Sequence, residues 1–74
     1  MTFTISGNTK QYGPERWEFT PVSNDKKNPK AVKVTRWVTT GANGGWYVIW
    51  KGYHFLGNAR IMWRDRIAQG WVAS

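Results

Sequence analysis

The 74-residue chain contains no cysteine, and it has one histidine and only four acidic residues. Without cysteine there is neither a disulfide nor a thiolate zinc site, and a lone histidine cannot hold a metal ion by itself. The four carboxylates are scattered along the chain, so they do not suggest the pair of groups that acid–base catalysis uses. We therefore expect a non-enzymatic protein with no metal site and no cofactor.

Long apolar runs are also missing. No stretch approaches the ~20 apolar residues of a membrane span, and residues 1–10 lack the charged start and the apolar core of a signal peptide. A chain of 74 residues is expected to form a single small domain over 1–74. Such a domain buries only roughly 60% of the surface that its unfolded chain exposes. We expect a soluble, cytoplasmic protein.

Positive charge and aromatic residues dominate what is present. Eleven Lys and Arg against four Asp and Glu give a net charge of +7. On so short a chain this charge attracts polyanions, above all nucleic acid and secondly an anionic membrane or an acidic protein. Six Trp, three Tyr and three Phe are many for a small core. Either they compensate for the thin core, or some of them are displayed to a partner.

Alternation of apolar and polar residues predicts an antiparallel sheet of four strands. The first three strands are expected over 2–6, 15–20 and 31–40, and the fourth follows the glycine-rich segment 41–45. The turn residues 6–8 are expected to end the first strand. Phe3 and Ile5 should share one face of the sheet, as should Trp17 and Phe19.

Segment 30–51 is the expected centre of the fold, a hairpin of two long strands. The third strand places Arg36 on one face with three valines, Val32, Val34 and Val38. Lys33 and Trp37 fall on the other face together with Thr35.

Two registers are compatible with the turn of this hairpin. A two-residue turn at Asn43-Gly44 places Trp37 opposite Trp50, whereas a longer loop over 41–45 places Trp37 opposite Ile49. A slip of one residue moves a whole set of side chains to the other face. The partners of Trp37 on its face are therefore either Trp46, Val48 and Trp50 or Tyr47, Ile49 and Lys51.

The C-terminal part predicts a helix over 59–69. Asn58 is the expected N-cap and Gly70 the expected C-terminal glycine cap. Leu56, Ala59, Trp63, Ile67 and Gly70 form a stripe that can pack on the sheet. A strand is the alternative, because arginines alternate with apolar residues here. Residues 71–73 are expected to form a short tail. The predicted fold is thus α+β, a four-stranded antiparallel sheet with one C-terminal helix, and the alternative is an all-β SH3-like barrel.

Basic and aromatic residues of the hairpin, the preceding loop and the helix form the candidate site. An exposed ring offers a base a stacking partner, and neighbouring Lys or Arg residues meet the phosphates. The candidate nucleic-acid-binding residues are Lys26, Lys27, Lys30, Lys33, Trp37, Lys51, Arg60 and Arg64.

The predicted function is therefore non-enzymatic nucleic-acid binding with modest sequence specificity, with single-stranded nucleic acid slightly favoured over duplex. The alternative is a small inhibitor or adaptor that docks its Trp-rich face on an acidic partner protein. The same face is also suited to forming a homodimer.

Overall fold

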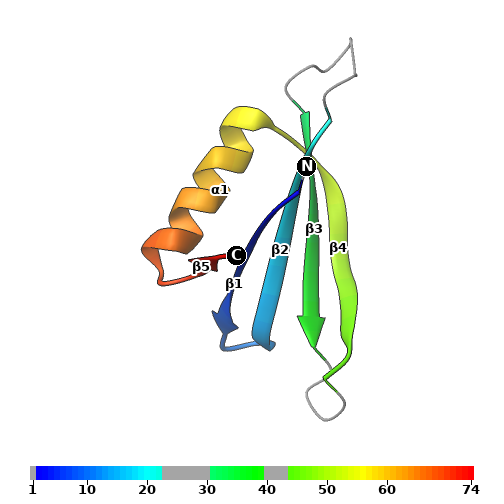
Figure 1. The fold of residues 1–74 in the computed structure, drawn as a ribbon, viewed down its shortest axis with the longest axis vertical. Coiled ribbons are helices and arrows are strands. Elements are labelled where there is room, and N and C mark those ends of the chain that lie inside the picture. Colours follow the sequence, from blue (N-terminus) through cyan, green and yellow to red (C-terminus); the bar gives the residue numbers. More distant parts are fainter. Residues whose placement is uncertain (1, 23–30, 40–43) are drawn as a thin grey trace.

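A five-stranded antiparallel sheet and one helix make up the fold, in a computed structural model that describes residues 2–22, 31–39 and 44–74. The elements follow in the order β1 (Phe3–Thr9), β2 (Gly13–Pro21), β3 (Ala31–Thr39), β4 (Trp46–Phe55), α1 (Leu56–Ala68) and β5 (Val72–Ala73) (Figure 1). The strand order across the sheet is β4-β3-β2-β1-β5. The α+β prediction is confirmed with five strands in place of four, and the all-β alternative is wrong.

The first hairpin is longer than its turn signals suggested. β1 continues through Gly7 and Asn8 to Thr9, which pairs with Gly13, so the turn spans residues 10–12. The expected strand end at residues 6–8 is therefore wrong. The Thr9 hydroxyl oxygen accepts a hydrogen bond from the Tyr12 N–H at 3.1 Å, and Gly13 has a positive φ of 70°. Both features stabilise a turn at this later position.

The hydrophobic core lies between the sheet and α1. Ile5 of β1 lies opposite Trp17 of β2, and Phe19 lies opposite Val34 of β3, so these side chains share one face as alternation predicted. Leu56, Met62 and Trp63 of α1 pack against them. The buried cluster consists of Ile5, Trp17, Phe19, Val32, Val34, Ala59 and Trp71. We call this the covered face of the sheet.

The helix begins at Leu56, because β4 runs directly into it. Phe55 is the N-cap, with extended backbone and no capping hydrogen bond from its side chain. The expected N-cap, Asn58, is wrong, since this residue lies inside α1. The predicted glycine cap is confirmed: Gly70 has a φ of 95°, its N–H donates to the Ile67 carbonyl, and the Trp71 N–H donates to Arg66. These two bonds satisfy carbonyls that the helix end would leave free. With 13 residues and a polar composition, α1, the one helix in the described ranges, is too short and too polar to cross a membrane.

The predicted tail is structured, because the glycine cap turns the chain back toward the sheet. Trp71 is buried and packs against Trp17 with ring centroids 5.4 Å apart. Val72 and Ala73 then form β5, which pairs with Ser6 and Ile5. The predicted helical stripe is correct for Leu56, Ala59 and Trp63, whereas Ile67 is exposed.

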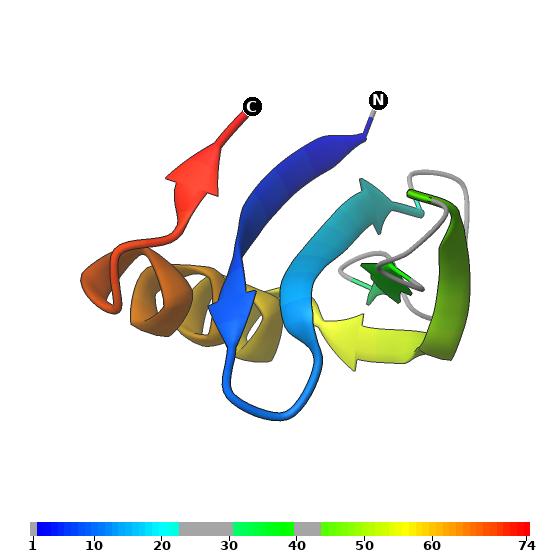
Figure 2. The same ribbon diagram turned by 90° about the horizontal axis from the view of Figure 1, so that it is seen from below.

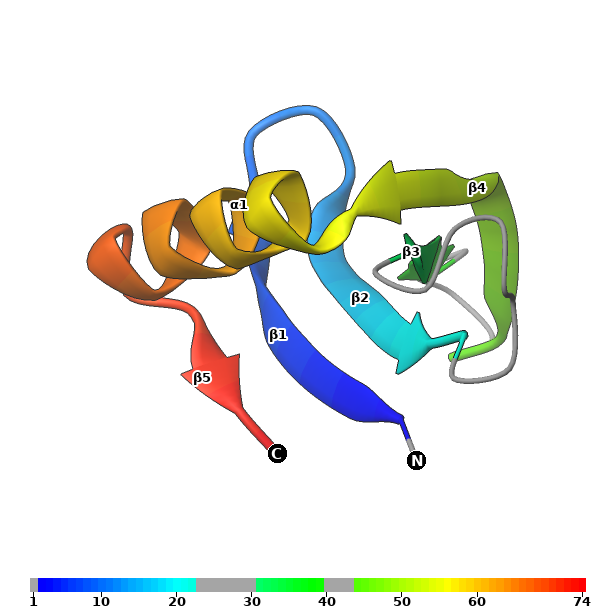
Figure 3. The same cartoon turned by 90° about the horizontal axis from the view of Figure 1, so that it is seen from above.

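β4 contains an irregularity that changes the face of its residues. Near the turn Trp37 lies opposite Val48, but the preceding residue of β3, Arg36, lies opposite Trp50. Ile49 is therefore the extra residue of a β-bulge. Neither predicted register holds throughout. Residues 31–36 of β3 pair as the longer loop predicts, whereas residues 37–39, next to the turn, are shifted by one more residue. Figures 2 and 3 show β4 curving toward α1.

Candidate functional site

The sheet has a second face, opposite the core, that α1 leaves uncovered (Figure 3). We call it the open face. The strand pairings place on it side chains from four strands, namely Thr4, Ser6, Arg16, Glu18, Thr20, Lys33, Thr35, Trp37, Trp46, Val48, Lys51 and Tyr53. Three of these residues are Lys or Arg and one is acidic, so the open face is positively charged.

Arg16 is held between two indole rings on the open face. Its Cζ lies 5.4 Å from the ring centroid of Trp37 and 4.8 Å from that of Trp46. The bulge makes this possible, because it brings Trp46 to the same side as Trp37. Arg16 forms no ion pair with any described residue. A guanidinium fixed by two rings and free of carboxylates is a preorganised partner for a phosphate.

Two hydrogen-bond donors in this stack have no acceptor among the described residues. The Nε of Arg16 and the Nε1 of Trp37 are buried, and neither has a partner among the described residues. Nearly all buried donors in proteins have a hydrogen-bond acceptor, so two buried donors without a described acceptor are unusual.

The far end of the open face carries free rings and two lysines. Lys33 lies opposite Tyr53, and Lys51 lies opposite Thr35. Tyr53 is 67% exposed and Phe55, at the end of β4, is 64% exposed. No aromatic or cation–π contact involves either ring within the described chain. These rings are therefore accessible to a partner.

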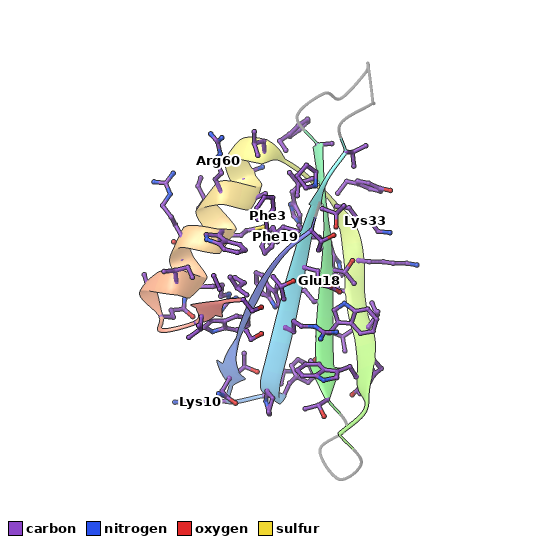
Figure 4. The ribbon with its side chains drawn as sticks, in the orientation of Figure 1. Phe3, Lys10, Glu18, Phe19, Lys33 and Arg60 are labelled. Carbon is purple, nitrogen blue, oxygen red and sulfur yellow. The ribbon has the colours of Figure 1, made fainter. Side chains whose placement is uncertain are left out.

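The structure brings together only part of the predicted site. Lys33, Trp37 and Lys51 share the open face as expected, although Arg16 occupies the ring of Trp37. Arg60 and Arg64 lie on α1, on the other side of the sheet from Lys33 (Figure 4). Lys26, Lys27 and Lys30 lie outside the described residues.

Sequence reasoning missed Arg16, Tyr53 and Phe55, and it left Trp46 undecided. Alternation does place Arg16 on the face opposite Trp17, but nothing local to β2 indicates that two rings of other strands enclose it. Tyr53 can be placed on the open face, opposite Lys33, only once the register of β3 and β4 is known. Trp50, the other undecided tryptophan, faces the covered side opposite Arg36 and lies 5.3 Å from the His54 ring.

A second charged cluster lies on the covered face and is internally neutralised. Glu15 is 1% exposed. Its Oε1 accepts hydrogen bonds from Trp17 Nε1 at 2.7 Å and from Arg36 Nη2 at 2.8 Å, and its Oε2 accepts one from Thr9 at 3.2 Å. Burial opposes the charged form of Glu15, but the bonds from Trp17, Arg36 and Thr9 outweigh it and lower the pKa of this carboxyl. This cluster has no unused charge to offer a ligand.

No group of three or more His, Asp or Glu side chains that could hold a metal ion occurs among the described residues. Comparison of the chain with protein-family models, with curated proteins and with solved structures found no match.

Proposed function

We propose that this protein binds single-stranded nucleic acid through the open face, without catalysing a reaction. The observation that carries the proposal is the guanidinium of Arg16, which is held between Trp37 and Trp46 and has no carboxylate partner among the described residues. It contacts a phosphate, while Lys33 and Lys51 contact others further along the strand.

The exposed rings supply the second half of the interaction. Bases stack on Tyr53 and Phe55, each stacked base contributing roughly 1–3 kcal/mol, with little dependence on sequence. Single strands are favoured over duplexes because their bases are available for stacking, and because the open face presents strands and no free helix for a groove. Modest sequence specificity follows, since phosphates and base faces are common to all sequences.

The test is a fluorescence-anisotropy titration with labelled oligo-dT, oligo-U and a DNA duplex. Three phosphate contacts predict a plot of log affinity against log salt with a slope of about −2, at about 0.7 per contact for single strands. Tight binding that does not respond to salt would contradict phosphate recognition. No binding to any of the three probes at low salt would end the proposal and leave the acidic partner protein as the better alternative.

Matched variants locate the site. Tyr53→Ala should weaken binding about tenfold, because one stacked base is lost. Tyr12→Ala removes a tyrosine from the turn of the first hairpin and should leave the affinity unchanged. Lys33→Gln with Lys51→Gln should lower the magnitude of the salt slope by about 1.4, whereas Arg60→Gln with Arg64→Gln removes the same charge from α1 and should not.

A further inference from the structure

The covered face contains an apolar groove that the nucleic-acid proposal does not use. It lies between the first half of α1 and the ends of three strands, and its volume is about 490 Å³. Its lining consists of Phe3, Phe19, Pro21, Val32, Leu56, Ala59, Arg60, Trp63 and Arg64. Figure 4 shows Phe3 and Phe19 on the side of the sheet that faces α1, and Arg60 on the helix.

The groove exists because α1 meets the sheet through a small side chain. Ala59 is the only buried residue of the helix. Trp63 packs edge-on against Phe19, with ring centroids 5.3 Å apart, and forms one wall. Phe19, Val32 and Ala59 are buried at the floor, whereas Phe3 is 47% exposed. An apolar floor with an open rim is a site for an apolar group that enters from solvent.

The polar part of the lining has a single sign. Arg60 and Arg64 are one helical turn apart, both are exposed, and none of the described residues that line the groove is acidic. Neither arginine forms an ion pair with a described residue. Two like charges at this spacing disfavour the helix slightly when nothing neutralises them. An anionic group bound at the rim removes this cost.

We propose that the groove binds an anionic amphiphile, with its apolar chain against Phe19, Val32 and Ala59 and its carboxylate or phosphate head between Arg60 and Arg64. Ligand sites commonly measure about 300–1,000 Å³ and combine an apolar lining with a few polar groups that fix the orientation of the ligand. The groove has this size and this composition. The amphiphile arrives either as a free molecule or as a lipid of a membrane surface.

The experiment is an NMR titration of the ¹⁵N-labelled full chain with monomeric decanoate, decyl phosphate, decanol and decyltrimethylammonium. Decanoate and decyl phosphate should shift the Trp63 indole N–H and the backbone amides of Phe3 and Ala59. Decanol and the cationic probe should bind at least about tenfold more weakly, because they lack the charge-assisted hydrogen bonds to the arginines. Equal binding of all four probes, or shifts elsewhere on the protein, would overturn the proposal.

Two double variants with equal net charge complete the test. Arg60→Gln with Arg64→Gln should weaken decanoate binding about tenfold or more and leave oligo-dT binding unchanged. Lys33→Gln with Lys51→Gln should weaken oligo-dT binding and leave decanoate binding unchanged. The two proposals can therefore be refuted independently of each other.

Vesicles of anionic phospholipid distinguish the source of the ligand. Vesicle binding that needs the arginines, in the absence of decanoate binding, assigns the groove to membrane lipid, and binding to neither refutes it.

Discussion

The two faces of the sheet carry the same pair of residues and use it differently. β2 and β3 each contain the sequence Arg-Trp, and their antiparallel pairing places Arg16 opposite Trp37 on the open face and Arg36 opposite Trp17 on the covered face. Both guanidinium groups lie about 5 Å from an indole ring, at 5.4 Å for Arg16 over Trp37 and 4.9 Å for Arg36 over Trp17. The two pairs thus have similar distances between the cation and the ring.

The two Arg–Trp pairs differ in one carboxylate, that of Glu15. Glu15 receives hydrogen bonds from both Arg36 and Trp17. No described carboxylate bonds to Arg16, and the indole N–H of Trp37 has no acceptor among the described residues. The same cation–π pair is therefore a structural element where an acid completes it, and a candidate binding element where the acid is missing.

The largest expected effect comes from removing the acid. Glu15→Gln should lower the free energy of unfolding by about 3 kcal/mol, because it leaves Arg36 without its partner in a largely buried cluster. Glu18→Gln is the matched control on the open face, and it should change stability by less than about 0.5 kcal/mol. Urea denaturation of both variants measures the difference. Equal losses would show that the two faces do not differ as described.

Gly7 tests the packing around the covered cluster. A Cβ at this position would overlap the indole ring of Trp71. Gly7→Ala should therefore destabilise the fold by about 2 kcal/mol through overpacking. Gly57→Ala is the control: nothing lies near its added Cβ, and inside α1 alanine should stabilise by about 0.5–1 kcal/mol. Opposite signs in thermal or urea unfolding confirm the close approach of Trp71 to β1.

Lowering the pH should weaken the interactions of Glu15 with Arg36 and Trp17 on the covered face. The pKa of Glu15 is lowered from its ordinary value of 4.5, so its charge contributes stability above that pH, and this contribution is lost as the pH falls toward the lowered pKa. The difference in unfolding free energy between wild type and Glu15→Gln should be constant from pH 7 to about pH 5 and shrink below. A difference that grows with acid would contradict the lowered pKa.

The smallest effect on stability should come from Arg16. Arg16→Gln removes two partly exposed cation–π contacts and should cost about 1 kcal/mol. The same variant should reduce the magnitude of the salt slope for oligo-dT by about 0.7, as one phosphate contact is lost. Arg16→Lys, which keeps the charge but not the planar stack, should retain most of that slope. Unfolding of Arg16→Gln would make the open-face pair structural and break the comparison.

Alternation predicted the faces of the strands well, because burial on one side enforces a period of two. Trp17, Phe19 and the valines of β3 lie where the pattern placed them. Gly70 was equally clear, since few other residues adopt its backbone conformation. These features depend on residues close together in the sequence.

The features that sequence reasoning missed depend on distant partners. β5 has two residues, and it forms because Trp71 docks on Trp17 and Gly7. The bulge at Ile49 shifts the pairing next to the turn into a register that neither expected turn predicted, and it places Trp46 beside Arg16. That no described carboxylate reaches Arg16 is a property of the whole open face, and no single segment of the chain specifies it.

The bulge also bears on how readily the exposed edge of β4 can pair with a second molecule. β4 is an outer strand of ten residues rich in exposed aromatic side chains, and such an edge invites strand-by-strand addition of another molecule. The extra residue at Ile49 breaks the even spacing of β4, so an incoming strand finds no continuous ladder along its full length. Deleting Ile49 would restore the even spacing of β4, and the resulting chain should be more prone to aggregation.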